Sequence, residues 1–297
     1  MGSLRNLGSS KNPVSGLRDG AKVLRWVTHT GQDLIEHFVS DPFLKAILAG
    51  QSGDHGMPPS QVSAFVHAGV THHYFNGGYF PRGGGFAIPR AFVRALKRAG
   101  GQIRLQTSVR QILIEGRRAV GVELADGTQI RSQHVISNAD PEVTFGKLIG
   151  YEHLPNRLQR KLNRAKYSVS VLSLFFAVDM DMRGAGLDSG NFWFYDHADV
   201  DGLYQQGLTS RALETQTPGL MFLTTTTLKD PSKMHSGHHT CEAFTFVGYE
   251  GFQKWANGVY GERPSDYEAM KEELSWRMFQ GLEKHVPGIS KNVVFWS

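Results

Sequence analysis

The chain has 297 residues, of which 40% are hydrophobic and 20% are charged, and these proportions are typical of a globular protein rather than a disordered chain or a coiled coil. Its net charge of +5 comes from Lys and Arg residues scattered along the sequence without a nucleic-acid-binding motif, which favours a solvated charged surface and no nucleic-acid partner. This length predicts one large domain or two interleaved domains.

The first 75 residues have the pattern of short helices joined by Gly and Pro connections. Thr30, placed before Asp33, is expected to cap the first helix, and Asp41 with Pro42 begins a second over residues 43–48. Ser60 is expected to open a third segment. Residues 1–13 lack the apolar run of a secretory signal and are expected to form a flexible start.

A glycine loop at residues 77–85 runs into a predicted helix that carries Ile88, Phe92 and Leu96 on one face and ends at Gly100-Gly101. Glycines before a helix leave backbone N–H groups free to approach an anion, and the helix dipole favours negative charge there. From its spacing the loop either meets a phosphate or a flavin edge or is a tight turn without a ligand.

Strand patterns follow this helix. They lie at 103–105, 109–114 and 120–124, with a hairpin turn at Asp126-Gly127, and a short apolar run at 135–136 stops where Ser137-Asn138-Ala139-Asp140-Pro141 must turn. We expect a domain boundary at this turn.

The last half predicts an α+β module. Strand-like runs lie at 167–178, 192–195, 220–227 and 241–247. One helix follows, in which Ser265 and Glu268 have the spacing of a capping box and Pro287-Gly288 closes the segment.

Familiar motifs of catalysis are absent from the sequence. There is no Walker loop, zinc cysteine pattern or G-x-S-x-G elbow, and Ile88 stands where the third glycine of a dinucleotide fingerprint would be. The histidines at 72–73 and 235–239 lack the spacing of metal ligands, so no metal is predicted. No pair of carboxylates is singled out as acid and base.

Cys241 lies in an apolar run without a cysteine partner, so a buried, inert thiol is expected. A single cysteine and the lack of any Asn-x-Ser/Thr site favour a reducing, cytoplasmic compartment. The longest apolar stretch, residues 169–178, is about half of the ~20 residues that cross a bilayer, and peripheral contact with a membrane is left open.

Aromatic residues cluster around the predicted strands and either line a cavity for a long apolar ligand or pack the core. The cluster comprises Phe175, Phe176, Phe192, Trp193, Phe194, Tyr195, Phe244, Phe246, Phe252 and Trp255.

Several of these segments together resemble the phytoene desaturase family, and most of all its retinol saturase and carotenoid isomerase branch. The resemblance is carried, in order, by Tyr79-Phe80-Pro81-Arg82-Gly83-Gly84, Ala119-Val120-Gly121-Val122, Asp126-Gly127 and Val135-Ile136-Ser137-Asn138-Ala139. Later stretches at 191–195, 242–247 and 287–288 are similar as well. The resemblance implies a fold of mixed α/β and α+β class, with part of a glutathione-reductase-like FAD domain and an α+β substrate domain. In this division residues 1–76 would be a helical part of the substrate region, 77–142 a middle segment of the FAD-binding domain and 143–297 the substrate-binding domain.

The resemblance also implies FAD as cofactor and a set of residues that contact it. Arg82, Gly83 and Gly84 would approach the flavin side, Val109 the adenosine end through its backbone, and Ser137, Asn138 and Ala139 the cofactor at a strand end. Family members open with a Rossmann βαβ segment and close with a glycine-rich flavin segment, neither of which is found in this sequence. FAD binding by this chain is therefore expected to be weak or absent, and a separate N-terminal chain is one partner to test.

The implied activity is desaturation, saturation or isomerisation of carbon–carbon double bonds in an apolar polyene or isoprenoid substrate. Two alternatives stay open: a redox-inactive module that binds a lipid or a partner, and an amine-oxidase-like flavoenzyme with a non-isoprenoid substrate.

Overall fold

The computed structural model describes residues 24–209, 217–259 and 261–297, so the flexible start expected at 1–13 lies outside the described residues. The chain forms two compact units: unit 1 consists of residues up to Ile88 and from Ser168 onward, and unit 2 runs from Pro89 to Tyr167. The division into 1–76, 77–142 and 143–297 concerns roles toward cofactor and substrate, and it stays a prediction.

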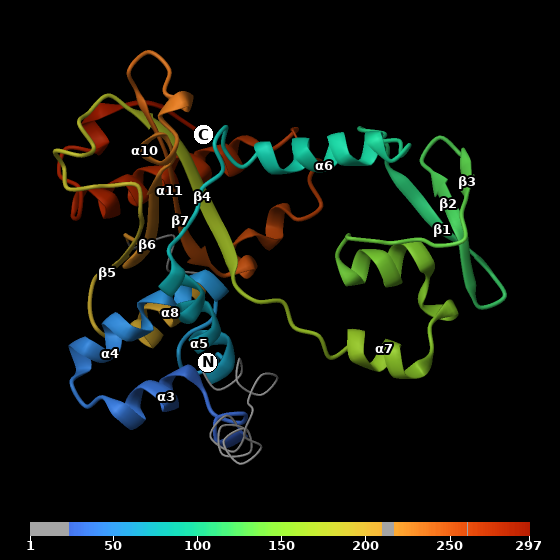
Figure 1. Cartoon of the computed structure of the whole chain (residues 1–297), viewed down its shortest axis with the longest axis horizontal. Helices are drawn as coiled ribbons and strands as arrows, with labels where there is room; N and C mark the ends of the chain where they lie inside the picture. Colours follow the sequence, from blue (N-terminus) through green and yellow to red (C-terminus); the bar gives the residue numbers. More distant parts are fainter. Residues whose placement is uncertain (1–23, 210–216, 260) are drawn as a thin grey trace, which may run out of the picture. The chain divides into compact units, whose positions relative to one another are not determined.

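Unit 2 is built on a three-stranded antiparallel sheet in the order β1-β2-β3 (Figure 1). Its elements are α6 (Ala87–Arg98), β1 (Val109–Glu115), β2 (Arg118–Leu124), β3 (Gln129–Arg131), the π-helical η3 (Glu142–Ile149), η4 (Tyr151–His153) and α7 (Asn156–Leu162). The hairpin predicted at Asp126-Gly127 is confirmed, because β2 pairs antiparallel with β3 across it.

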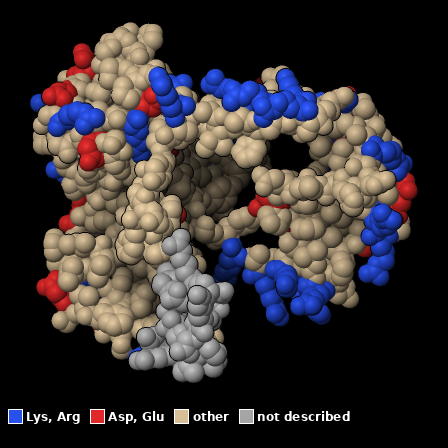
Figure 2. Space-filling model, viewed as in Figure 1, with Lys and Arg blue, Asp and Glu red and all other residues tan. Residues whose placement is uncertain are grey.

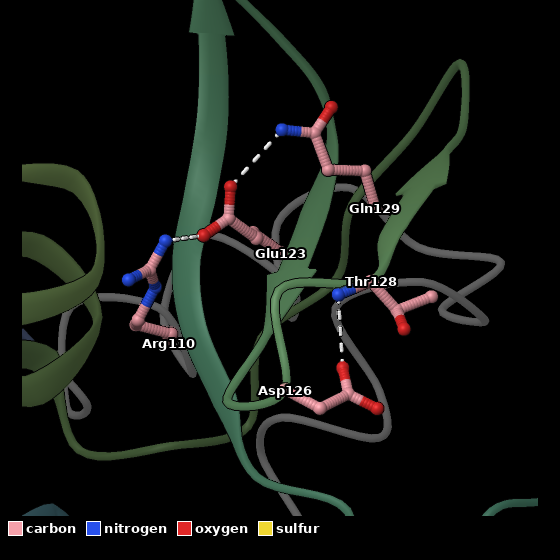
Figure 3. Close-up of polar contacts among 5 residues, drawn as sticks. All are labelled: Arg110, Glu123, Asp126, Thr128 and Gln129. Carbon is pink, nitrogen blue, oxygen red and sulfur yellow. Dashed lines mark hydrogen bonds and ion pairs between the residues drawn. The ribbon is translucent and has the colours of Figure 1, made fainter.

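One buried carboxylate organises this small sheet, as Figure 3 shows. Glu123, only 8% exposed, accepts hydrogen bonds from the guanidinium of Arg110 and from Nε2 of Gln129, the latter at 3.0 Å. At the turn, Oδ1 of Asp126 accepts the backbone N–H of Thr128 at 2.9 Å. A buried charge is tolerated here because it is fully paired.

One strand expectation in unit 2 is wrong. Residues 103–105 form no strand, and Leu105 is exposed because no neighbouring strand pairs with this segment. The run at 135–136 is also without regular structure, and Ile136 is 95% exposed. Apolar pairs this short predict a strand only where a partner strand and a buried face exist.

Unit 1 is built on a five-stranded sheet in the order β5-β6-β7-β4-β8, and every pair of neighbours is antiparallel. The strands are β4 (Ser170–Val178), β5 (Asn191–Tyr195), β6 (Leu220–Thr225), β7 (His239–Val247) and β8 (Val293–Trp296). The first four confirm the predicted strand-like runs, although the third ends in a turn of helix, α10 (Thr226–Lys229).

Helices cover both faces of this sheet. The N-terminal ones are α3 (Gly31–Phe38), α4 (Pro42–Ala49), η1 (Gly50–His55), α5 (Ala64–His73) and η2 (Tyr74–Asn76); the later ones are α8 (Val200–Leu208), η5 (Pro231–Lys233), η6 (Tyr249–Trp255), α11 (Ser265–Glu283) and η7 (Ser290–Asn292). Leu174, Phe176 and Leu223 pack with Met278 and Phe279 of α11 on one face. On the other, Leu220 and Phe246 pack with residues of α3, α4 and α8.

The helix starts test the capping predictions directly. Thr30 caps α3 in a capping box with Asp33, and Asp41 caps α4, as predicted. The prediction for Ser60 is wrong, because α5 begins after Ser63, whose hydroxyl caps it, while Ser60 bonds Asp201. The capping box at Ser265 is also wrong: Ser265 is the first helical residue, and no side chain caps the helix.

Candidate functional site

Two rows of side chains cross the face of the unit 1 sheet that lies opposite α11. The strand register places Trp193, Phe222 and Phe244 side by side across β5, β6 and β7, and their rings are in contact at centroid distances of 5.0, 5.4 and 4.5 Å. We call these three residues the aromatic row. Each member of the aromatic row has a polar residue two positions away on its strand. These three residues, Asn191, Thr224 and Glu242, are also neighbours across the strands, and we call them the polar row.

The polar row is unusual because it lies on an otherwise apolar face. Glu242 pairs with Phe175 of β4 on its other side, so aromatic rings adjoin the polar row along two directions. Thr224 is 6% exposed, and its Oγ1 has no hydrogen-bond partner among the described residues. A buried hydroxyl without a partner costs free energy, which makes Thr224 a candidate for contact with a bound group.

Lys229, at the end of α10, reaches the polar row. Its Nζ donates to Oδ1 of Asn191 and lies 5.6 Å from the ring centroid of Phe80 in the glycine loop. Burial lowers the pKa of Lys229, and the nearby Glu242 carboxylate offsets part of that effect. The amine is therefore held between an amide, a carboxylate and an aromatic face.

The glycine loop is fixed against the residue that follows Lys229. The backbone N–H of Gly83 donates to Oδ2 of Asp230 at 2.5 Å, and that of Gly84 donates to the carbonyl of Pro81 at 3.0 Å. Bonds to Ser232 and to Gly83 lower the pKa of Asp230. Gly83 and Gly84 have positive φ angles of 91° and 76°, which a glycine adopts without strain. These two amides are thus engaged within the chain.

Helix η1 holds Trp193 of the aromatic row and the nearby Tyr195 in place through hydrogen bonds. Nε1 of Trp193 donates to Oδ1 of Asp54 at 3.2 Å, and the hydroxyl of Tyr195 donates to the carbonyl of Gly50 at 2.8 Å. Gly53 lies flat against the indole, where an added Cβ would come within 2.1 Å of the ring. Burial raises the pKa of Tyr195 to about 12, so this phenol stays protonated.

His55, the last residue of this helix, forms a pair with His67 of α5. Nε2 of His67 is 3.0 Å from the carbonyl of Leu48, so this nitrogen carries a hydrogen and Nδ1 accepts one. That Nδ1 is 3.4 Å from Nε2 of His55. The remaining nitrogen, Nδ1 of His55, is buried and has no partner among the described residues.

The predicted cofactor residues fall into two groups. Arg82, Gly83 and Gly84 belong to unit 1, in contact with the Asp230 turn. Val109, Ser137, Asn138 and Ala139 belong to unit 2. Val109 is the first residue of β1, while Ser137 Oγ bonds both Oγ1 of Thr144, at 2.7 Å, and the N–H of Ala139, at 3.3 Å. Asn138 is exposed within this turn.

The predicted aromatic cluster divides between several places. Phe176, Phe192 and Phe194 pack on the α11 side, whereas Trp193, Phe244 and Phe246 pack on the opposite side. Phe252 and Trp255 line a separate cavity of about 320 Å³ with Tyr249 and Tyr267. Core packing is therefore correct for most members of the cluster, and a cavity for a long apolar ligand stays a prediction.

The remaining candidate residues are the lone cysteine and the histidines. Cys241 is buried as predicted, and burial raises the pKa of its thiol to about 11. Within residues 24–209, 217–259 and 261–297 no three His, Cys, Asp or Glu residues gather as metal ligands, and His239 bonds Thr227 instead. In the same ranges no helix has the length and apolar character needed to span a bilayer.

Sequence reasoning missed the polar row and Lys229. Thr224 and Glu242 are polar residues inside strand-like runs, at alternate positions with Phe222 and Phe244. This alternation of polar and aromatic residues is the sequence signal that could have revealed the polar row. The approach of Asn191, Lys229 and Phe80 depends on contacts between distant segments, which a single sequence does not show.

Comparison with known proteins places the chain in a family. The model for flavin-containing amine oxidoreductases matches residues 27–268. An all-trans-retinol 13,14-reductase from Danio rerio is 25% identical over 91% of this chain and 46% of its own length. A chloroplastic prolycopene isomerase from Arabidopsis thaliana is 30% identical over 75% of this chain and 34% of its own. An inactive all-trans-retinol 13,14-reductase from Danio rerio is 26% identical over 80% and 41%.

The solved structures agree at the level of the fold. An oxidoreductase from Methanosarcina mazei superimposes with a TM-score of 0.58 and 16% identity, covering 99% of this chain and 62% of that one. The mixed α and β architecture with a partial flavin-binding fold is thus confirmed, as is the resemblance to phytoene desaturase-like FAD oxidoreductases. The chain spans about half the length of these curated retinol reductase relatives. It belongs to the family of flavin-containing amine oxidoreductases.

Proposed function

We propose that this chain is the substrate-binding part of a flavin-dependent oxidoreductase that desaturates, saturates or isomerises double bonds of an apolar polyene. The observation that carries the proposal is the aromatic row with its adjoining polar row, on one sheet face beside the glycine loop. Relatives named for retinol and prolycopene support a polyene as the substrate class.

In this proposal the protein positions the substrate, and the cofactor carries out the redox chemistry. Flavin, when bound, supplies the two-electron chemistry, as cofactors do in such enzymes. Phe222 is buried and stacks on Phe244, and Trp193 is kept in place by Asp54. Phe175, which pairs with Glu242 and is 52% exposed, offers apolar surface to a conjugated chain. Thr224 Oγ1, buried and without a described partner, fits a group that both donates and accepts, such as an isoalloxazine edge or a substrate hydroxyl.

The cofactor contacts remain part of the proposal. Arg82 supplies a positive charge beside the turn at Gly83 and Gly84, which supports a place near the flavin. The rest of FAD would contact Val109 and the Ser137-Asn138-Ala139 turn. In this turn the Ser137 hydroxyl bonds Thr144, and Asn138 is exposed.

Absorption spectra of the purified chain test the flavin claim. The spectrum is recorded before and after addition of FAD and desalting, and a flavin band near that of bound FAD is the expected result if the chain suffices. A chain that retains flavin only when mixed with an N-terminal partner identifies a split enzyme. A chain that retains none under either condition counts against the flavin claim.

Binding of the substrate class is tested separately with all-trans-retinol and a hydrocarbon carotenoid. Either polyene is expected to quench the fluorescence of Trp193, and Trp193→Phe removes the quenched component. Trp276→Phe, on the α11 side of the sheet, is the matched control and should leave that component in place. Quenching unaffected by Trp193→Phe would place the polyene elsewhere.

A redox-inactive binding module is the second candidate. The relative named as an inactive reductase, which aligns over 80% of this chain, favours it. Polyene binding with no flavin under any condition selects this alternative. Turnover of amines but not of polyenes by flavin-loaded protein selects the amine-oxidase-like reading instead.

Peripheral contact with a membrane would suit an apolar substrate, and α6 supports it. Figure 2 shows Lys and Arg side chains in a row over this helix, whose sequence supplies Arg90, Arg94, Lys97 and Arg98, while Phe92 and Leu96 are exposed. Such helices bind anionic bilayers through charge and apolar area together. Sedimentation with phosphatidylserine vesicles but not with neutral ones is expected, and Phe92→Ser should weaken it.

A further inference from the structure

A cavity of about 320 Å³ in unit 1 lies apart from the aromatic and polar rows. It is lined by the first residues of β4, the end of β7, helix η6 and the start of α11, and we call it the η6 cavity. Small-molecule sites usually have volumes of about 300–1,000 Å³, so this one is large enough for a small ligand. Val247 pairs with Ser170 here, roughly 16 Å along β4 from the Phe175–Glu242 pair at the usual rise of about 3.3 Å per residue. The η6 cavity is therefore a separate place on the molecule.

Most of the wall of the η6 cavity is apolar and held in a fixed position. Leu172 and Phe252 line it together with the indole of Trp255, which is 8% exposed. Nε1 of this indole donates to both carboxylate oxygens of Asp266 at 3.2 Å, and the ring of Tyr267 packs against it edge to face at a centroid distance of 5.4 Å. Such a wall favours a hydrocarbon chain, because apolar area on both partners is removed from water.

Among the described residues that line the η6 cavity, Arg263 is the one with a charge. Its Nη1 donates to the backbone carbonyls of Trp255, at 2.9 Å, and Gly258, at 3.3 Å, and its guanidinium lies over the ring of Tyr267 at 5.2 Å. These contacts fix the plane of the guanidinium. Its Nε and Nη2 have no hydrogen-bond partner among the described residues, and no described carboxylate lies within ion-pair distance of it.

The free edge of Arg263 selects the chemistry of the ligand. The N–H groups of Nε and Nη2 point in parallel and match the two oxygens of a carboxylate. A cation would be repelled by this edge, and a neutral hydrocarbon would leave it unpaired. Asp266 does not fill the place, because its oxygens accept from Trp255 and Lys254. A carboxylate that carries an apolar chain suits both the charged edge and the apolar wall.

We propose that the η6 cavity binds an aliphatic monocarboxylate, whose carboxylate accepts from Nε and Nη2 of Arg263 and whose chain lies along Leu172, Phe252 and Trp255. The inference goes beyond the proposed function, because it requires neither a flavin nor a polyene and can fail without affecting either. Arg263 is a binding residue here and takes part in no bond-breaking step. Asp266 positions the indole that forms the wall.

Isothermal titration calorimetry of the chain with sodium decanoate tests the proposal, and decanol is the matched ligand without a charge. Decanoate is expected to bind at least about tenfold more tightly than decanol, as a pair of charge-assisted hydrogen bonds predicts. Arg263→Gln should remove this difference by weakening the binding of decanoate alone. Arg183→Gln, which alters an exposed arginine of unit 1 outside the cavity lining, is the control and should change neither affinity. No binding of decanoate, equal affinities of the two ligands, or equal losses in both variants would overturn the proposal.

A second measurement uses the unaltered chain, because Arg263 also holds the carbonyls of Trp255 and Gly258 and its replacement affects that loop as well. Decanoate that carries a diazirine is photolysed with the protein, and the labelled peptides are identified by mass spectrometry. Label is expected in η6 and in the first turn of α11, and an excess of plain decanoate should suppress it. Label confined to other elements, or label that plain decanoate does not suppress, overturns the proposal whatever the variants show.

Discussion

At the scale of single residues, Gly53 has the least room for change in the candidate site. A Cβ at this position would lie 2.1–2.4 Å from three atoms of the Trp193 ring. Gly53→Ala is therefore expected to lower the free energy of unfolding by about 1–3 kcal/mol through overpacking, and to shift Trp193 emission. Urea denaturation measures the loss. Gly78→Ala, with nothing within 4 Å of the added atom, should be nearly neutral, and a similar loss in both variants would contradict the packing argument.

The His55–His67 pair predicts acid sensitivity. Burial and the neighbouring His67 lower the pKa of His55 to about 4, and burial lowers that of His67. The folded state then binds fewer protons than the unfolded state, so stability falls as pH drops from about 6.5 toward 4. We expect a loss of roughly 1–2 kcal/mol between pH 7 and pH 5 from His55. Urea midpoints at both pH values test it: His55→Gln should flatten the dependence, while His73→Gln, at an exposed position, should not.

The residue scale also shows what a single sequence can and cannot reveal. Cys241 could be placed in the core because a lone cysteine within an apolar run has one reasonable environment. The position of Lys229 could not be recognised, because it contacts Asn191, 38 residues away, and Phe80 in the glycine loop. Chemistry created by distant neighbours leaves no local pattern.

At the scale of elements, the two capping predictions give a matched pair of variants. Thr30 accepts the N–H of Asp33 at 3.1 Å, whereas Ser265 lies inside its helix and caps nothing. Thr30→Ala should therefore cost about 1 kcal/mol and Ser265→Ala close to zero. Thermal melts of both variants test this difference. The structure predicts a loss of stability for Thr30→Ala alone, whereas the sequence pattern predicts similar losses for both variants.

The elements themselves were largely predictable where periodicity was long. Strands β4 to β7 and helix α11 follow from runs of alternating or helical spacing that extend over five residues or more. The failures share a cause in tertiary contacts: the hydroxyl of Ser60 is drawn to Asp201, and Asp266 beside Ser265 is bound to Trp255. Such contacts override a local capping signal without leaving a trace in the pattern.

At the scale of the molecule, the two units are built on separate cores. Every residue of the two core clusters on either side of the five-stranded sheet belongs to unit 1. Unit 2 has its own buried residues, among them Ile112, Leu124 and Leu154. We therefore expect the units to unfold as separate cooperative transitions, since each buries its apolar surface within itself.

The tryptophans make this expectation measurable, because all five belong to unit 1: Trp26, Trp193, Trp255, Trp276 and Trp296. Their fluorescence reports unit 1 alone, while far-UV circular dichroism reports both units. Glu123→Ala removes the carboxylate that holds Arg110 and Gln129, and should destabilise unit 2 by about 1–2 kcal/mol. The dichroism transition should then broaden or split while the fluorescence midpoint stays fixed. Glu115→Ala, which removes an exposed ion pair with Arg131, should change neither signal. Coincident shifts of both signals in Glu123→Ala would show instead that the two units unfold as one, because a defect in unit 2 would then change the signal of tryptophans that all belong to unit 1.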